Sequence, residues 1–316
     1  MRVYKSLDEF SPLSHAVVTQ GTFDGVHIGH QKIIERLGNI AAQKQGETVL
    51  LTFFPHPRMV LQPEDNQLRL LHTEDEKIEH LAKAGIDHLL IIPFTKEFSR
   101  QTSLQFVRDV LVDKVGIKTL VIGYDHRFGK NREGSMDDLR RFGNEFKFEV
   151  EEISPQDIDD ITVSSTKIRN ALTHGDVETA TRYLGYNYPV SGKVVAGNNL
   201  GKKIGFPTAN ILVSQTYKLI PGDGVYAIKA TVHGQTYGGM ANIGNQPTFD
   251  NRSHAFEVNI FGFDKDIYGE EVKIEFVSRI RSEMKFDGVD SLIAQLQNDK
   301  ATALNILNTN ESRKLV

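Results

Sequence analysis

The sequence predicts an α/β protein with two domains, a doubly wound parallel sheet followed by an antiparallel barrel or sandwich. Up to about residue 186, apolar runs of strand length alternate with helical spacing, as in βαβ units. Beyond that point, short strand-like runs are separated by glycine, proline and aspartate turns, and 13 of the 26 glycines lie there. The length of 316 residues also suits roughly two domains.

In the first half, five strand candidates alternate with helical faces. The strand candidates are 17–19, 49–54, 89–92, 120–122 and 146–150. Helical spacing is found at 33–41, 78–81 and 104–111, and then in two short segments, 168–172 and 177–184. Open parallel sheets bind ligands at the carboxyl ends of their strands, so the loops that follow these runs are candidate sites.

In the second half, the predicted elements are mainly strands. They are 190–195, 224–232, 237–243, 256–263 and 272–280. The segment 289–307 has helical spacing and predicts a closing helix. The change of pattern predicts one domain over residues 1–186 and a second over residues 187–316.

The composition excludes several classes of protein. With 39% hydrophobic and 25% charged residues, wholesale disorder is not expected. The net charge of −4 argues against a nucleic-acid partner. No apolar run approaches the roughly 20 residues of a membrane span, and the first residues lack a signal-peptide core, so we expect a cytoplasmic protein. The absence of cysteine removes disulfides, thiolate metal sites and thiol nucleophiles.

The first candidate site is the segment 21–30, between the first predicted strand and the first helix. Its glycines allow a ligand close to the backbone, and the helix N-terminus offers free N–H groups to a phosphate. The candidate phosphate-binding residues are Gly21, Phe23, Asp24, Gly25 and Gly29. His27 and His30 are three residues apart and can stabilise the charge of a leaving pyrophosphate. The alternative is a polar turn with two incidental histidines.

A second candidate combines hydroxyl groups and cations at the start of a helical segment. The residues proposed to bind ATP phosphates there are Ser164, Ser165, Thr166 and Arg169. Hydroxyl groups can bind phosphate oxygens, and an arginine can hold a phosphate through two hydrogen bonds. The alternative is an ordinary helix N-cap.

A glycine-rich, basic loop near residue 200 is the candidate site of the second half. The spacing of a Walker A loop is absent from the chain. The loop can still wrap a polyphosphate through Gly197, Gly201, Lys202 and Gly205. Thr208 and Asn210 offer hard oxygen ligands for Mg²⁺. The alternative is a flexible hairpin.

These segments together resemble a known family. The HxGH and SSTxxR-type motifs are similar to those of the nucleotidylyltransferase superfamily. With the segments 52–58, 121–134, 197–210, 242–249 and 281–286, the chain resembles bacterial bifunctional riboflavin kinase/FAD synthetases over roughly residues 15–300. The resemblance implies a Rossmann-like nucleotidylyltransferase domain and a β-barrel kinase with a closing helix.

The resemblance also implies an activity and roles for residues. The barrel would phosphorylate riboflavin with ATP and Mg²⁺, and the first domain would adenylylate FMN to FAD with release of pyrophosphate. Glu257 would be the catalytic base of the kinase, and His27 and His30 would serve the transferase. The implied flavin-binding residues are Phe54, His56, Pro57, Asp125, Phe128 and Arg281.

The partners expected on this basis are small molecules: riboflavin, FMN, FAD and ATP, with neither nucleic acid nor membrane, and a weak homo-oligomer is left open. One alternative is a nucleotidylyltransferase that acts on another phosphate ester, with the C-terminal half as a lid. Another is a non-catalytic flavin carrier or RNA-binding regulator, because HxGH also occurs in class I aminoacyl-tRNA synthetases.

Overall fold

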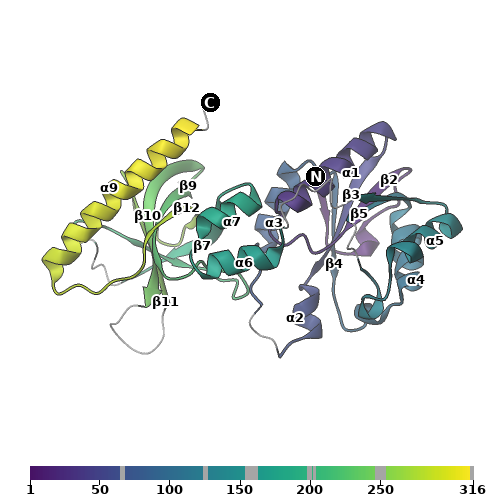
Figure 1. The fold of residues 1–316 in the computed structure, drawn as a ribbon, viewed down its shortest axis with the longest axis horizontal. Coiled ribbons are helices and arrows are strands. Elements are labelled where there is room, and N and C mark those ends of the chain that lie inside the picture. Colours follow the sequence, from purple (N-terminus) through teal and green to yellow (C-terminus); the bar gives the residue numbers. More distant parts are fainter. Residues whose placement is uncertain are drawn as a thin grey trace. The chain divides into compact units, whose positions relative to one another are not determined.

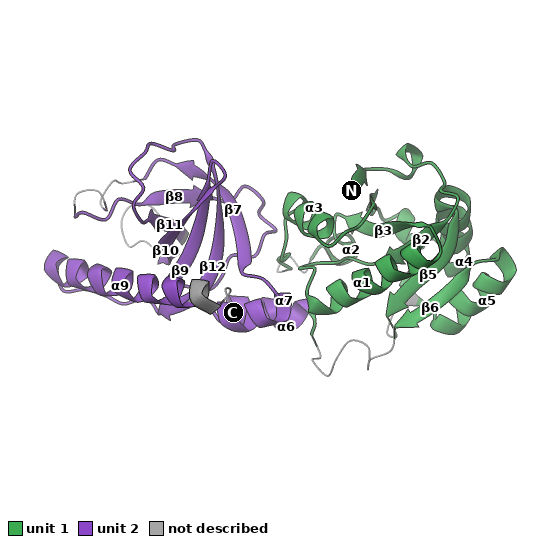
Figure 2. Cartoon of the chain, turned by 90° about the horizontal axis from the view of Figure 1, so that it is seen from above, with its two compact units in different colours: residues 1–164 green, residues 165–316 purple. Residues whose placement is uncertain are grey.

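The computed structural model describes residues 1–64, 68–123, 127–153, 163–197, 201, 204–245 and 254–313 (Figure 1). The chain divides into two compact units, Met1–Ser164 and Ser165–Val316 (Figure 2). Helices α6 (Ser165–Thr173) and α7 (Val177–Leu184) therefore group with the β-rich half. The division of the two activities at residue 186 stays a prediction.

Within the described part of the first unit, six strands form one parallel sheet in the order β1-β4-β3-β2-β5-β6. They are β1 (Arg2–Tyr4), β2 (Ala16–Gln20), β3 (Glu47–Phe54), β4 (His88–Pro93), β5 (Ile117–Gly123) and β6 (Glu149–Ile153). The predicted parallel sheet is confirmed. The sequence analysis missed the short edge strand β1 and placed the last strand three residues too early, because Phe146 ends a helix.

The helices of this unit cover both faces of the sheet. They are α1 (Ile28–Gln43), α2 (Pro57–Leu61), α3 (Glu74–Lys83), α4 (Ser103–Gln105), which continues as a π-helix over Phe106–Val115, and α5 (Met136–Phe146). Neighbouring residues of β2 show the two layers. Val17 belongs to the core cluster with Leu37 of α1, whereas Val18 belongs to the cluster with Leu111 and Leu139. This alternation confirms that the sheet is doubly wound.

In the second unit, the described strands close a barrel in the order β10-β11-β8-β7-β12-β9. They are β7 (Tyr188–Val195), β8 (Ala209–Leu212), β9 (Gly224–Val232), β10 (Gln235–Asn245), β11 (His254–Ile260) and β12 (Glu271–Arg281). Helix α9 (Val289–Arg313) follows, as predicted. The closed barrel settles the choice between barrel and sandwich. The sequence analysis missed β8, because its first two residues, Ala209 and Asn210, were assigned to the glycine-rich loop.

Within the described ranges, we find no helix that is both long and apolar enough to cross a bilayer.

Candidate active sites

The histidine loop joins β2 to α1 through a tightly wound turn. Phe23 and Val26 have left-handed φ angles of 44° and 33°, and Gly25 has one of 87°. His27 ends the turn as the N-cap of α1, where its Nδ1 accepts the backbone N–H of His30 at 3.3 Å. The His27 side chain thus caps one free N–H group of the first helical turn. The same hydrogen bond fixes the imidazole ring at the N-terminus of α1.

The two imidazole rings lie against one another. Their centroids are 3.7 Å apart with an angle of 15° between the planes, and the Phe23 ring is 4.7 Å from that of His30. Burial, together with His27 and Lys77, holds the pKa of His30 well below its ordinary value of 6.5. His30 is therefore neutral near pH 7 and can donate a hydrogen bond to an anion without carrying a charge itself.

Two buried charged side chains, Asp24 and Lys77, stabilise the histidine loop through hydrogen bonds to backbone groups. Asp24 is 1% exposed, and its carboxylate accepts the backbone N–H groups of Leu71 (3.0 Å) and His72 (3.3 Å). Any contribution of that carboxylate to phosphate binding would accordingly act through the shape of the loop. Lys77 is also buried and donates from Nζ to the carbonyl oxygen of Thr22 at 2.8 Å.

Lys77 was missed by sequence reasoning. It follows Glu74, Asp75 and Glu76 in α3, and such a run is typical of a solvated helix face. Burial lowers the pKa of Lys77, while Asp24 and Glu74 act in the opposite direction. No pattern in the sequence alone distinguishes this lysine from an exposed one.

The expected flavin residues of the first unit have different surroundings. Phe54 ends β3 and packs against the core, His56 caps α2 by accepting the Arg58 N–H at 3.2 Å, and Pro57 is the first residue of that helix. Strand β3 pairs with β2 in parallel, so these residues follow the same sheet edge as Gly21. Asp125 lies outside the described residues.

Phe128 is 6% exposed and belongs to the hydrophobic core. Its ring lies 6.3 Å from that of Phe106, and a Cβ added to Gly134 would approach it to 2.6 Å. The described surroundings make Phe128 a packing residue of the loop after β5. Its contact with a flavin stays a prediction.

The serine-rich motif spans the junction of the two units. Ser164 ends the first unit, while Ser165, Thr166 and Arg169 lie in the first turns of α6 in the second unit. Ile168 and Leu172 form the buried face of this helix. The meeting of the motif with the histidine loop in one active site stays a prediction.

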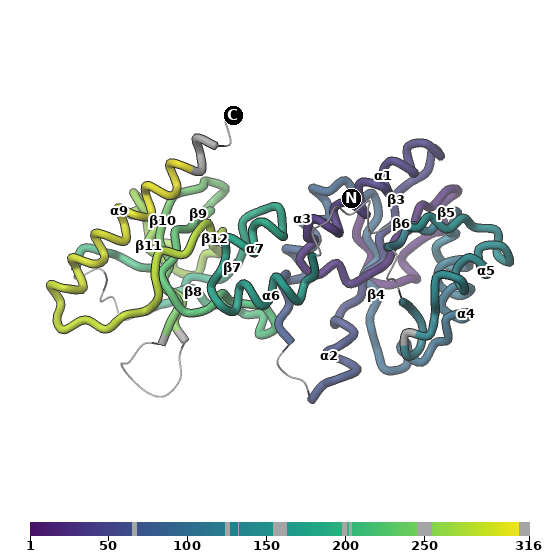
Figure 3. Tube along the Cα trace, viewed as in Figure 1, coloured from purple at the N-terminus to yellow at the C-terminus, as the bar shows by residue number. Residues whose placement is uncertain are grey.

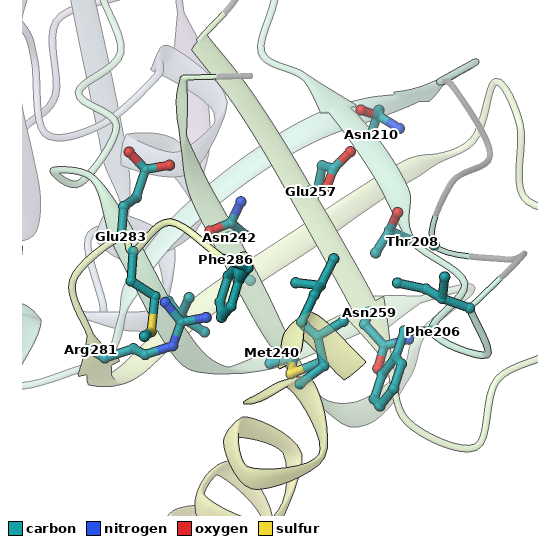
Figure 4. A pocket seen from close by; sticks show the side chains of 17 residues that line it. Phe206, Thr208, Asn210, Met240, Asn242, Glu257, Asn259, Arg281, Glu283 and Phe286 are labelled. Atoms are coloured by element: carbon teal, nitrogen blue, oxygen red, sulfur yellow. The ribbon is translucent and has the colours of Figure 1, made fainter. Parts of the chain in front are cut away.

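The second candidate site is a cavity of about 320 Å³ at the barrel (Figure 4). Its polar residues come from adjacent strands: Glu257 of β11 pairs in register with Asn210 of β8 and with Asn242 of β10. Directly opposed residues have Cβ atoms roughly 5 Å apart, so these three side chains form one polar row. The apolar lining includes Phe206 and Met240.

Figure 4 shows Thr208, Asn210 and Glu257 toward one side of the cavity and Arg281 and Glu283 toward the other. Buried Phe256 and Val258 flank Glu257 in the strand, so the carboxylate lies on the face opposite to theirs. This placement brings together five of the residues predicted for the kinase: Gly201, Thr208, Asn210, Glu257 and Arg281.

The described glycines of the glycine-rich segment lie close to Thr208 and Asn210. A Cβ added at Gly197 would lie 1.9 Å from Nδ2 of Asn210, and one at Gly201 would lie 3.1 Å from Oγ1 of Thr208. Gly205 has a φ of 82°. Only glycines therefore allow the loop to approach the two oxygen-bearing side chains so closely. Lys202 lies outside the described residues.

The donor set suits Mg²⁺, which prefers a few protein oxygens completed by phosphate and water. Thr208, the residue before β8, and Asn210, within β8, offer such oxygens, and Gly197 and Gly201 approach them closely. The described residues contain no cluster of three or more acidic or histidine side chains that could form a cage of their own. A metal at this place would depend on the phosphates of a nucleotide.

Helix α9 fixes the other side of the cavity. Arg281 donates from Nη2 to Oδ2 of Asp299 at 2.8 Å and from Nε to Oδ1 at 3.0 Å. Its guanidinium lies 5.8 Å from the centre of the Phe286 ring, which also lines the cavity. Asp299 was not among the predicted site residues, because α9 shows only a helical pattern in the sequence.

In comparisons with known proteins, each half of the chain matches its own family model. The family model described as FAD synthetase matches residues 10–167, and that described as riboflavin kinase matches residues 184–307. Two curated relatives are named bifunctional riboflavin kinase/FMN adenylyltransferase. The one from Listeria monocytogenes is 42% identical over 93% of this chain and 92% of its own, and that from Bacillus subtilis is 38% identical over 92% of each.

A solved structure is similar to this chain over most of its length. The crystal structure of the protein named Macrolide-efflux Protein from Streptococcus pneumoniae matches with a TM-score of 0.87 and 34% identity. It covers 96% of this chain and 98% of its own. With matches of both halves and full-length relatives above 30% identity, the chain belongs to the family of bifunctional riboflavin kinase/FMN adenylyltransferases.

Proposed function

We propose that this chain makes FAD in two steps. The barrel transfers the γ-phosphoryl group of ATP to the 5′-hydroxyl of riboflavin, and the first unit joins FMN to the adenylyl group of a second ATP. The observation that supports this most directly is the barrel cavity, in which Glu257 stands between Asn210 and Asn242 beside an apolar lining. The family of the chain supports the same two reactions.

In the kinase step, Glu257 is the proposed base. Its carboxylate accepts the 5′-hydroxyl proton while that oxygen attacks the γ-phosphorus, and ADP leaves as the bond to the β-phosphate oxygen breaks. Phe206, Met240 and Phe286 offer apolar surface for the flavin ring. Thr208 and Asn210 would hold Mg²⁺, which when bound neutralises phosphate charge.

In the adenylylation step, the proposed nucleophile is a phosphate oxygen of FMN. It attacks the α-phosphorus of ATP, and the bond to the β-phosphate oxygen breaks to release pyrophosphate. Because the FMN phosphate is already anionic, this step requires no base. His27 and His30, with the N-terminus of α1, would stabilise the negative charge, and the Ser165–Arg169 segment would bind the phosphates of ATP.

The test is to incubate the purified chain with riboflavin, ATP and Mg²⁺ and to separate the flavins by chromatography. We expect FMN and then FAD. Glu257→Ala should stop formation of FMN but still convert added FMN to FAD. Glu271→Ala, at the exposed start of β12, is the matched control and should retain both steps. Normal FMN formation by Glu257→Ala would refute the assigned base, and loss of both steps would contradict the separation of the sites.

The proposed function also implies which partners and which cellular location we expect. We expect small-molecule substrates, a cytoplasmic location and no nucleic-acid complex; a salt-dependent shift of RNA by the chain would contradict the last point. A weak homo-oligomer is open to measurement by light scattering.

A further inference from the structure

The α6–α7 hairpin is built into the barrel unit. Figure 3 traces α6 through α7 directly into β7, and both helices carry the colour of the barrel unit in Figure 2. The hairpin turns at Gly175, whose φ is 75°. A Cβ there would lie 2.6 Å from the hydroxyl oxygen of Tyr226 and 3.1 Å from Cζ of Arg279, so the turn is pressed against barrel strands β9 and β12.

The carboxyl end of α6 takes part of its hydrogen bonds from residues 174–176, which follow the helix, and part from the barrel unit. The last carbonyl groups of a helix have no partner within the helix and need donors from elsewhere. Leu172 of α6 accepts the backbone N–H of Gly222 at 2.8 Å. The carbonyl oxygen of His174, just beyond the helix, accepts Nη1 of Arg279 at 3.3 Å.

Arg279 joins this helix end to the next barrel loop. Its Nη2 donates to the carbonyl oxygen of Asp223 at 2.6 Å. Its backbone N–H donates to Glu178 of α7 at 3.1 Å, and that same carboxylate oxygen accepts the hydroxyl of Ser278. One strand segment of the barrel therefore holds both helices of the hairpin.

We propose that Arg279 is a positioning residue for FMN adenylylation, because it anchors α6, the helix that begins with the ATP-binding segment of that reaction. The inference rests on the proposed role of Ser165, Thr166 and Arg169. A helix transmits a displacement of one end to the other, and an error of about 1 Å in substrate position can cost about a hundredfold in rate. The barrel then has a second task, in addition to the kinase reaction.

The structure also indicates that the two tasks share one part of the barrel. Arg279 pairs in register with Tyr226, and after a register shift Arg281 pairs with Val225. Arg281 and Val225 both line the kinase cavity. At the end of the β9–β12 pair, Arg281 and Val225 thus face the cavity. The neighbouring pair, Arg279 and Tyr226, contacts the hairpin.

The test uses the full chain and measures both reactions. Arg279→Met removes the guanidinium but retains a long apolar side chain. We expect the KM for ATP in FMN adenylylation to rise about tenfold or more, with riboflavin phosphorylation changed less than about twofold. Arg279→Lys, which restores one donor, should recover part of the loss. Arg182→Met is the matched control, because this exposed arginine donates to Thr179 within its own helix α7, and it should change neither reaction.

The outcomes separate this proposal from the proposed function. If the wild-type chain formed no FAD, the proposed function and this inference would both fall. If it formed FAD and Arg279→Met left the adenylylation kinetics unchanged, only this inference would be overturned. If Arg279→Met lost both reactions, Glu178→Ala becomes the deciding variant, since it frees α7 from Ser278 while retaining the arginine. Equal loss of both reactions in that variant would also overturn the inference.

Discussion

The pair formed by Arg281 and Asp299 connects the stability of the barrel to its cavity. Asp299 lies on α9 and is 1% exposed, while the side chain of Arg281 is 19% exposed. Oδ1 of Asp299 also accepts Nε2 of Gln295 at 2.8 Å. Asp299→Asn preserves the shape of the side chain but removes its charge, so this substitution isolates the electrostatic part of the interaction.

The expected loss of stability follows from the burial of the pair. Removal of one partner from a fully buried ion pair costs about 3 to 5 kcal/mol, because the other charge is left uncompensated. Water reaches part of Arg281 here, so we expect about 3 kcal/mol. For a unit of this size, about 2 to 4 °C is lost per kcal/mol, which gives a decrease in Tm of roughly 6 to 12 °C.

The measurement is calorimetry of the full chain, in which the transition of the barrel unit is followed separately. Arg281 also contacts the Phe286 ring, so we expect the KM for riboflavin to rise in the same variant. Asp290→Asn, in the exposed first turn of α9, is the control and should shift the Tm by about 4 °C or less. A barrel transition within about 2 °C of wild type, together with an unchanged KM, would refute the reasoning.

Three further predictions concern the two loops. Gly197→Ala places a methyl group 1.9 Å from Asn210, so it should raise the KM for ATP in riboflavin phosphorylation. Lys77→Met removes the donor to the Thr22 carbonyl and should lower the rate of FMN adenylylation by about tenfold, corresponding to one hydrogen bond of about 1.4 kcal/mol. Burial keeps the pKa of His30 below 6.5 in the folded state, so the unfolded chain binds more protons below that pH. The stability of the first unit should therefore fall below about pH 6.5, by at most about 1.4 kcal/mol per pH unit from this group, and His30→Gln should reduce that slope in denaturant titrations.

Each of these variants has a control. Gly38→Ala lies in α1 with open space around the new Cβ and should be neutral or stabilising, by about 1 kcal/mol at most. Lys83→Met ends the same helix as Lys77 but is exposed, and should retain adenylylation. His233→Gln, an exposed histidine of the other unit, should leave the pH slope of the first unit unchanged. Equal effects of a variant and its control would contradict the corresponding explanation.

Much of the fold could be predicted because the cores impose strict periodicities. The strand 224–232 was predicted with the bounds that β9 has, since the run is mainly apolar and is flanked by turns that contain glycine. Helix α5 was missed, although Ser135 and Asp138 form a capping box at its start. Charged residues make up much of that helix, so its narrow apolar face was not recognised as a helical pattern in the sequence.

The site was less predictable, because its support comes from contacts distant in sequence. His27 and Glu257 belong to motifs and could be selected, whereas Lys77 and Asp299 act on loops or strands far from them along the chain. Asp24 illustrates the same limit: its phosphate-binding role stays a prediction, and the motif gave no sign that its carboxylate accepts backbone amides near residue 71. A sequence pattern predicts which residues are present in a site but does not predict what holds them.

The central position of β2 also matters while the protein is being made. β2 pairs on one side with β3 and on the other with β5, whose register begins with Ala16 opposite Ile117. At translation rates of about 5 to 20 residues per second, this second partner emerges roughly 5 to 20 s after β2. Until then, an apolar strand has one unpaired edge, which favours association with other chains. The strand that leads into the histidine loop is thus also where a nascent chain depends on timely folding or chaperone binding.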